Sequence, residues 1–167
     1  MELSDGEVTV RSWRADDLDE LVAAVNDPEI ARWMPAIPHP YSHADARAYL
    51  ARATGREGTF AVVDTGSGRL LGGITVNAQN WGRADIGYWV RADARDRGVA
   101  SRALTLVAGW GLGRYRRLQL HADVENIASQ RVAEKAGFRR EGVLRAWIEQ
   151  NGSQRDHVLY SLLQGDR

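Results

Sequence analysis

The feature that most constrains the fold is a strand pattern that leads through a short polar loop into a helical pattern, between residues 86 and 104. Residues 86–90 are aromatic and β-branched and carry no charge, as expected of a mostly buried strand. After the loop, Ala100, Leu104 and Val107 recur at the spacing of one helix face. We therefore expect a buried strand that runs directly into a buried helix.

The loop between these two elements has the chemistry of an anion-binding site. The first amides of a helix have no intrahelical partner, and the macrodipole adds about half a positive charge there. Gly98 would let a phosphate group approach the backbone closely, and Arg95 and Arg97 add charge nearby. The alternative is that Gly98 only eases a tight turn and that the arginines are solvated, since short glycine motifs are common.

Length and composition predict a single globular domain, residues 1–167. The chain is 44% hydrophobic and 26% charged, which is typical of folded proteins. No run is long enough to span a membrane, and residues 1–10 lack a signal-segment pattern, so we expect a cytoplasmic protein without a membrane partner. The chain has no cysteine, which excludes disulfides, thiolate metal ligands and a cysteine nucleophile. We expect no metal site.

Charge is balanced overall but not locally. The formal net charge is zero, so nothing in the bulk charge favours nucleic acid as a partner. Arg91, Arg95, Arg97 and Arg102 nevertheless gather around the proposed anion loop. This distribution favours a nucleotide-bearing ligand over a nucleic acid.

The remaining patterns predict a mixed α/β sheet flanked by helices. Alternating or apolar runs at residues 8–13, 59–64, 69–76, 118–124, 143–149 and 157–163 join residues 86–90, for about six to seven strands. Residues 65–68 and the pair Asn151 and Gly152 are hairpin turns, and residues 77–83 are a loop that carries Trp81. Predicted helix starts are Asp16 or Asp17, Asp27 with Pro28, Ser42 and Asn126.

Residues 33–41 form a loop rich in proline and apolar side chains. Such a composition cannot form regular structure. It fits either a ligand-binding loop or a hydrophobic plug over the sheet, and the residues alone favour neither.

Two motifs resemble the GCN5-related N-acetyltransferases (GNAT), and within them the RimJ/RimL-like branch. The first is Arg95-x-x-Gly98-x-Ala100, directly after a strand and before a helix. The second is residues 126–138, which follow the pattern N-x-x-S-x-x-(V/A)-x-x-x-x-G-F. The resemblance spans nearly the whole chain. It implies the GNAT fold, in which the sheet opens into a V between its two central strands and acetyl-coenzyme A lies in the V.

By this resemblance, the strand before the loop pairs its backbone with the pantetheine arm, and the loop amides hold the pyrophosphate. Asn126 would contact the pantetheine, and Ser129 would donate a proton to the leaving thiolate. The alternative is that both residues only cap a helix. The implied cofactor-binding residues are Tyr88, Trp89, Val90, Arg95, Arg97, Gly98, Val99, Ala100, Ser101, Arg102, Asn126 and Ser129.

The general base is the point at which the chain departs from the family pattern. The glutamate that RimL-like members carry aligns with Ile148, and its neighbour Glu149 should face the other side of the strand. Candidate bases are Asp85, His121, Glu149 and Asp156. His121 has a suitable unperturbed pKa, although a lone strand histidine is more often structural.

The predicted function is that of an acetyl-coenzyme A-dependent N-acetyltransferase, in which an amine attacks directly in a ternary complex. An α-amino group, with a pKa near 8, is an easier acceptor than lysine near 10.4. Alternatives are an acyltransferase for a small amine such as an antibiotic, polyamine or amino acid, and a non-catalytic acyl-coenzyme A-binding module. We expect a monomer or homodimer. The candidate acceptor-binding residues are Trp33, Met34, Tyr41, Trp81, Asp85, Trp147, Asp156 and Tyr160.

Overall fold

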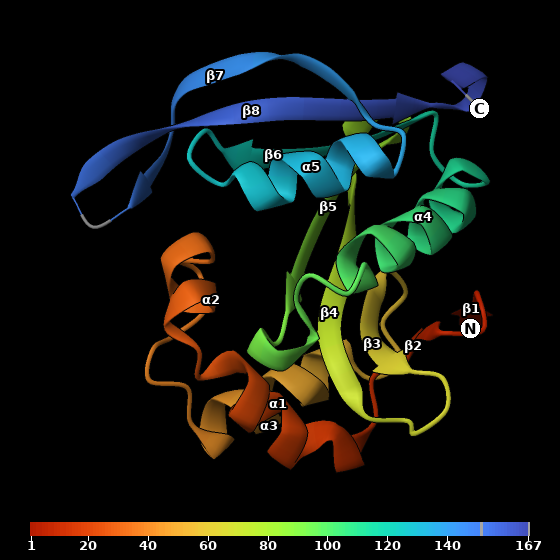
Figure 1. Cartoon of the computed structure of the whole chain (residues 1–167), viewed down its shortest axis with the longest axis vertical. Coiled ribbons are helices and arrows are strands. Elements are labelled where there is room, and N and C mark those ends of the chain that lie inside the picture. Colours follow the sequence, from red (N-terminus) through yellow and green to blue (C-terminus); the bar gives the residue numbers. More distant parts are fainter. Residues whose placement is uncertain (151, 167) are drawn as a thin grey trace.

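An eight-stranded sheet with helices on both faces organises the chain (Figure 1). The computed structural model describes residues 1–150 and 152–166. The strand order is β1-β2-β3-β4-β5-β6-β8-β7. The strands are β1 (Glu2–Ser4), β2 (Val8–Ser12), β3 (Thr59–Asp64), β4 (Leu70–Gln79), β5 (Arg83–Val90), β6 (Arg117–Asp123), β7 (Arg139–Gln150) and β8 (Ser153–Leu163). The α-helices are α1 (Leu18–Val25), α2 (Pro28–Trp33), α3 (His43–Ala53), α4 (Val99–Leu112) and α5 (Ile127–Lys135).

The two central strands, β5 and β6, are the only parallel pair among the described strands, and they separate soon after they meet. They pair at three positions only: Arg83 with Arg117, Ala84 with Leu118 and Asp85 with Gln119. Beyond that point β5 continues to pair with β4 as far as Val90, and β6 continues to pair with β8. The two halves of the sheet therefore diverge, as Figure 1 shows, and the predicted V is confirmed.

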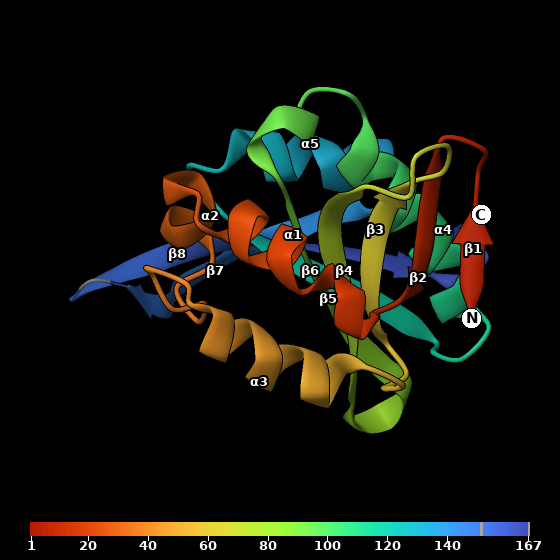
Figure 2. The same ribbon diagram turned by 90° about the horizontal axis from the view of Figure 1, so that it is seen from below.

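Each face of the sheet carries its own core. On one face, Ile86 of β5 and Leu118 and Leu120 of β6 pack beneath α4 and α5. On the other face, Leu21 of α1 and Leu50 of α3 belong to a second cluster, and these two helices lie next to each other in both views (Figures 1 and 2). Full burial of such a side chain contributes roughly 1.5–3 kcal/mol to stability. Because side chains alternate along a strand, β5 presents Ile86 to the first core and Trp89 to the second.

Capping side chains set two of the predicted helix starts. Ser42 and Asp45 form a reciprocal capping box at α3, with the Asp45 amide 3.1 Å from Ser42 Oγ and the Ser42 amide 2.9 Å from Asp45 Oδ2. The side chain of Asn126 accepts a hydrogen bond from the Ser129 amide (3.0 Å) at α5. Both predicted caps are confirmed.

Neither predicted residue caps α1: Asp16 lies within the 3₁₀ turn Ala15–Asp17, and the side chain of Asp17, directly before α1, makes no capping hydrogen bond to it. Its carboxylate instead accepts two hydrogen bonds from Arg11, at 2.7 and 2.9 Å, and both side chains are buried. Removing either partner would leave a buried charge uncompensated, which typically costs about 3–5 kcal/mol.

The sheet differs from the prediction at its edges and turns. β1 was not predicted, because three residues are too few to establish an alternating pattern. The predicted loop over residues 77–83 was wrong: β4 continues to Gln79, and only a 3₁₀ turn, Asn80–Gly82, separates it from β5. β7 begins at Arg139, before the predicted start at residue 143. Asn151 of the predicted β7–β8 turn lies outside the described residues. No helix in the described residues has the length and hydrophobicity needed to cross a membrane.

We expect Glu141→Gln to lower the melting temperature at pH 7. The Glu141 carboxylate of β7 accepts hydrogen bonds from Arg117 of β6 (2.7 and 2.6 Å) and from Ser161 of β8 (2.5 Å), so it joins three strands. The bonds from Arg117, then that from Ser161, lower the pKa of Glu141 to about 2. Because this folded-state pKa lies below the ordinary value of 4.5, the stabilisation is present above pH 4.5 and is lost as the pH falls toward 2.

Thermal unfolding of wild type and variant between pH 7 and pH 3 checks this prediction. The difference in melting temperature should shrink steadily below pH 4.5. Glu149→Gln, at an exposed glutamate of the same strand, is the matched control. A difference that is the same at pH 7 and pH 3 would contradict the expected linkage.

Candidate functional site

The loop that leaves β5 ends at an uncapped helix N-terminus. After Val90 the chain passes through a 3₁₀ turn, Ala92–Ala94, and reaches Gly98, which has φ 77°. No side chain among the described residues caps α4, so its first amides have no side-chain acceptor. A Cβ atom at Gly98 would lie 3.9 Å from the side chains of Ser101 and Arg102, in a conformation that other residues rarely adopt. Glycine at this position therefore leaves the approach to the first amides of α4 free of a side chain.

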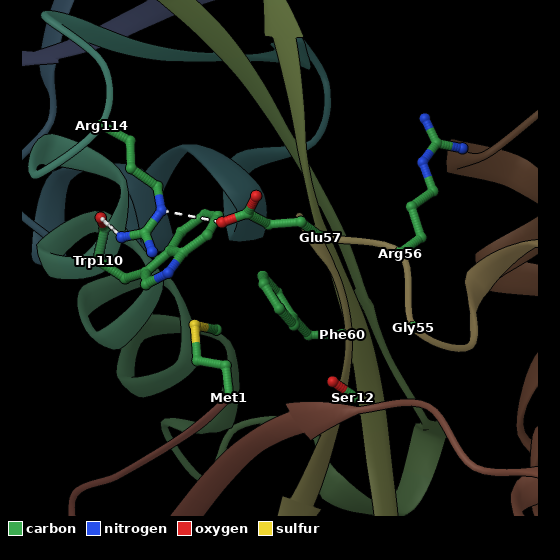
Figure 3. Close-up of a pocket in the computed structure, with 8 residues that line it drawn as sticks. All are labelled: Met1, Ser12, Gly55, Arg56, Glu57, Phe60, Trp110 and Arg114. Carbon is green, nitrogen blue, oxygen red and sulfur yellow. Dashed lines mark hydrogen bonds and ion pairs between the residues drawn. The ribbon is translucent and has the colours of Figure 1, made fainter.

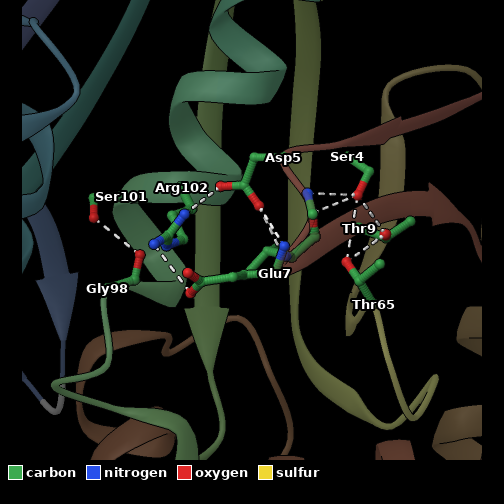
Figure 4. Close-up of polar contacts among 10 residues, drawn as sticks. Ser4, Asp5, Glu7, Thr9, Thr65, Gly98, Ser101 and Arg102 are labelled. Carbon is green, nitrogen blue, oxygen red and sulfur yellow. Dashed lines mark hydrogen bonds and ion pairs between the residues drawn. The ribbon is translucent and has the colours of Figure 1, made fainter.

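Two arginines flank this helix start in different states. Arg97 is exposed. Arg102 forms ion pairs with Asp5 (2.8 Å) and Glu7 (3.0 Å) of the β1–β2 turn, as Figure 4 shows. A hollow of about 290 Å³ lies between this turn and the loop, with Arg97, Arg102 and Glu7 among its lining residues. The basic groups thus surround the N-terminus of α4, and acidic side chains already hold one of them.

Arg95 does not extend toward the helix N-terminus, unlike the prediction from its motif position. Its guanidinium donates to the Val90 carbonyl (3.2 and 3.3 Å) and pairs with Asp27, which also accepts from the Glu29 amide (2.9 Å) at the start of α2. The side chain is therefore already engaged by the end of β5 and by α2. The Arg95 guanidinium therefore links the loop to α2 and is not available to a ligand unless these contacts break.

Tyr88 and Ser129 meet on the face that carries α4 and α5. The Tyr88 hydroxyl lies 2.8 Å from Ser129 Oγ and 3.3 Å from the Ser129 carbonyl oxygen, and its single proton can be donated to either of these acceptors. Burial raises the pKa of Tyr88 to about 12, and the hydrogen bond with Ser129 opposes that rise. Tyr88 is therefore a neutral phenol at physiological pH. The alternative that both Asn126 and Ser129 only cap α5 therefore holds for Asn126 but not for Ser129. Asn126 caps the helix, whereas the Ser129 hydroxyl forms a hydrogen bond with Tyr88 of β5.

A histidine pair lies on the opposite face of the sheet. The Nδ1 atoms of His121 on β6 and His157 on β8 are 2.8 Å apart. The Trp147 ring of β7 stands edge-on to His121 with its centroid 5.7 Å away. Asp85, the last β5 residue paired with β6, accepts a hydrogen bond from the Gln119 amide group (2.7 Å). Imidazole, indole and carboxylate therefore gather where the two arms begin to part.

The short helix α2 connects the two arms on this second face. At its start, Asp27 pairs with Arg95 of the β5 arm. At its end, Arg32 reaches Glu125 of the β6–α5 turn (3.7 Å), and Gln150 of β7 donates to the Arg32 carbonyl. Trp33 and Met34, both half-buried, terminate this helix. They remain candidates for lining an acceptor path, together with Trp147.

The structure removes four predicted acceptor residues from that path. Tyr41 is buried (8% exposed) in the core under α1 and α3, and Tyr160 is fully buried, with its hydroxyl donating to Glu134 of α5 (3.0 Å). Trp81 is 85% exposed in the turn at the closed end of the V. Asp156 accepts from the amide of Ala146 (2.7 Å), where β7 takes a positive φ of 51°, and so holds a bulge.

Trp89 and Glu149 were also predicted as site residues. The Trp89 side chain stacks on Trp13 in the second core, with centroids 6.5 Å apart, which leaves only its backbone for pairing in the V. Glu149 is exposed near the end of β7.

A second hollow, of about 260 Å³, lies away from the V. Its lining includes Phe60, Trp110 and Arg114, with Arg114 paired to Glu57 (3.0 Å), as Figure 3 shows. Because Trp110 and Arg114 lie at the end of α4 opposite Gly98, this hollow is remote from the loop. It is a crevice between the end of α4 and strands β2 and β3.

Sequence reasoning missed His157 and the second role of Asp27. His121 and His157 are 36 residues apart, and nothing in either local pattern relates them. Only the antiparallel pairing of β6 with β8, with His121 opposite Leu159 and Asp123 opposite His157, brings them together.

Comparison with known proteins identifies the family. The chain matches the model of the acetyltransferase (GNAT) domain over residues 7–139. It is 26% identical over 165 residues to the uncharacterized N-acetyltransferase p20 of Bacillus licheniformis, covering 94% of this chain and 93% of that protein. It is 27% identical over 158 residues to the L-amino acid N-acetyltransferase AaaT of Escherichia coli, covering 90% and 94%.

Solved structures share the fold. A GNAT-family acetyltransferase from Bacillus anthracis superposes with a TM-score of 0.90 at 23% identity, covering 98% of each chain. Spermidine N-acetyltransferase from Vibrio cholerae, in complex with CoA and spermine, gives 0.81 at 20% identity, covering 97% and 98%. RimL, a ribosomal L7/L12 α-N-protein acetyltransferase in complex with coenzyme A, gives 0.83 at 18% identity, covering 98% of each chain.

The chain therefore belongs to the GNAT family, as its motifs predicted, and it is an acyltransferase.

Proposed function

We propose that this protein transfers an acetyl group from acetyl-coenzyme A to a primary amine, with both substrates bound at once. The observation that carries the proposal is the V itself: the edge of β5 that faces β6 is unpaired beyond Asp85, and it leads to the uncapped N-terminus of α4. An extended amide chain can pair with such a strand edge, and a pyrophosphate with such a helix start. The described residues fit the ligand.

The residues that would hold acetyl-coenzyme A follow from this geometry. The backbone of Tyr88 to Val90 offers the unpaired edge, and the amides from Val99 to Ser101 offer the anion site. Arg97 is available as a counter-charge, whereas Arg102 would exchange Asp5 and Glu7 for phosphate. When bound, acetyl-coenzyme A supplies an activated acyl group whose leaving thiolate needs a proton.

Ser129 is placed to deliver that proton. Its hydroxyl is not used as a helix cap, and the neutral phenol of Tyr88 can donate to it. A hydroxyl that accepts from Tyr88 keeps its own proton for a third partner. Tyr88 and Ser129 therefore form a short donor chain on the α5 face.

The acceptor most compatible with the mouth of the V is an amine on an uncharged or apolar body, with a peptide N-terminal α-amino group as the leading example. Trp33, Met34 and Trp147 supply apolar area there. Two of the acidic groups nearby are already engaged by arginine, because Arg155 bonds to Asp123 (2.8 and 3.0 Å) and to Glu125 (2.8 Å). This pairing reduces the negative charge that could attract a polycation. The relatives named for amino acids, a ribosomal protein and spermidine define the acceptors to compare.

Gly98→Glu should abolish binding of acetyl-coenzyme A while leaving the protein folded. The new side chain would bring bulk and negative charge to the α4 N-terminus, where the site favours an anion. The measurement is the shift in melting temperature with added coenzyme A. Gly165→Glu, at an exposed glycine near the C-terminus, is the control and should retain the full shift. A full shift in Gly98→Glu would refute the site.

Ser129→Ala should lower kcat by roughly one to four orders of magnitude while the affinity for coenzyme A changes little, because the thiolate loses its proton donor. Tyr88→Phe should lower kcat in the same direction by a smaller factor, since Ser129 keeps its hydroxyl. Steady-state kinetics and coenzyme A titration measure the two effects separately. An unchanged kcat in Ser129→Ala would exclude proton donation through this serine.

Neutral-bodied amines should be better acceptors than spermidine. A thiol-release assay would compare kcat/KM for peptides with a free small or apolar N-terminal residue, an aromatic amine, an aliphatic amine and spermidine. Trp33→Ala should raise KM for the preferred acceptor without changing cofactor binding. Trp81→Ala, in the exposed turn at the closed end of the V, should leave KM unchanged. Faster acetylation of spermidine than of every neutral amine would overturn this view, and a protein that binds coenzyme A but acetylates no amine would be a binding module.

A further inference from the structure

We propose that His121 is the base that removes the proton from the acceptor ammonium group, and that His157 is the positioning residue that holds it ready. The inference rests on the proposed acetyl transfer to an amine. It concerns His121 of β6 and His157 of β8, which no sequence motif relates.

The position of His121 follows from the register of the central strands. Asp85 and Gln119 are the last residues that pair across β5 and β6. Side chains on one face of a strand recur every second residue. The next residues on that face are therefore Gly87 on β5 and His121 on β6. His121 is thus the first side chain of the β6 arm beyond the apex of the V, and Gly87 opposite it presents no side chain.

The two rings have distinguishable roles because they differ in exposure and in strand. His121 is half-buried on the strand that borders the V, whereas His157 is buried (8% exposed) one strand farther away. With the Nδ1 atoms 2.8 Å apart, one ring must donate its Nδ1 proton and the other must accept it. If His121 donates to His157, its Nε2 carries a free lone pair. That tautomer is the one a base requires.

The surroundings keep the pair neutral and limit it to one added proton. Burial lowers the pKa of both rings. Asp85 raises the pKa of His121; for His157, Asp123 and Asp156 raise it, whereas Arg155 and His121 lower it. Two imidazolium rings cannot face each other through two Nδ1–H groups, so the second protonation is excluded by geometry. A neutral imidazole beside a carboxylate can accept a proton at physiological pH.

The other candidate bases either accept hydrogen bonds from neighbouring residues or lie near the far end of β7. Asp156 is held by the Ala146 amide, and Asp85 accepts from Gln119. Glu149 is exposed near the end of β7. Among the bases predicted from sequence, only His121 combines a half-buried position with a partner that fixes its tautomer.

The proton balance is complete with these groups. One proton of the acceptor R–NH₃⁺ passes to Nε2 of His121, and the resulting imidazolium is stabilised by its Nδ1–H bond to His157. The neutral nitrogen forms the C–N bond as the C–S bond breaks. As the amide forms, the nitrogen gives its second proton to Ser129, which passes its own hydroxyl proton to the thiolate and so ends the cycle unchanged. His121 then returns its proton to water.

The first test uses the protein without ligands. ¹⁵N-detected NMR of the four histidines should identify His121 as the Nδ1–H tautomer and His157 as the Nε2–H tautomer, and both should titrate below 6.5. His157→Gln should change the titration of His121, since the glutamine oxygen can accept the same Nδ1 proton but carries no charge. His43→Gln, at an exposed histidine that begins α3, should change neither. Independent titrations of His121 and His157 at ordinary values would overturn the pairing.

The second test is kinetic. His121→Ala should lower kcat/KM for the preferred amine by about 10²–10⁴-fold and be partly rescued by added imidazole, with coenzyme A binding unchanged. His157→Gln should lower kcat/KM by a smaller factor. The pKa that describes the fall of kcat/KM at low pH should shift in this variant together with the pKa of His121 measured by NMR. Full activity in a folded His121→Ala variant would overturn the inference while leaving acetyl transfer intact. So would a kinetic pKa that is the same in His157→Gln as in the wild type. If the wild-type protein binds coenzyme A yet acetylates no amine, the proposed function is wrong, and the role of His121 as a base is wrong with it.

Discussion

The structure depends on the early end of pairing between β5 and β6. Backbone groups of a sheet interior are normally paired, and an unpaired buried strand edge is costly. Here the parallel ladder stops after Asp85 and Gln119, so both central strands keep one open edge in the middle of the molecule. The sheet halves remain in place because α4 and α5 pack across both of them on one face. The open edges of β5 and β6 border a slot at the centre of the molecule, which in the proposed function takes an extended polar ligand.

The same divergence assigns different chemistry to the two faces. On the α5 face lie two hydrogen-bonded hydroxyl groups, those of Tyr88 and Ser129, and the raised pKa of Tyr88 keeps its phenol neutral. On the other face lie the imidazoles of His121 and His157, whose Nδ1 atoms are 2.8 Å apart. In the proposed reaction, the proton donor and the proton acceptor are therefore separated by the thickness of one sheet. Alternation along the strands is sufficient to produce that separation.

Local sequence predicted most of this architecture because its signals are local. Ser42 and Asn126 act within one turn of helix, and the strand before Gly98 is recognisable from its own residues. The partners of charged side chains were not predictable in that way. Arg95 turns back to Asp27, 68 residues away, and His157 meets His121 only through strand pairing. Tyr41 and Tyr160 were predicted to line the acceptor site but are buried, because local sequence does not show whether an aromatic ring faces a ligand or a core.

The bridge made by α2 has a consequence for ionic strength. A six-residue helix has little stability of its own, so its position is set by its anchors. The Asp27–Arg95 anchor is partly buried, whereas Arg32 and Glu125 are both more than half exposed. Exposed ion pairs are screened by salt far more than buried ones. Rising salt therefore weakens the ion pair between α2 and the β6 arm before the one between α2 and the β5 arm. The Trp33 end of the helix gains freedom while the Asp27 end stays with the loop that follows β5.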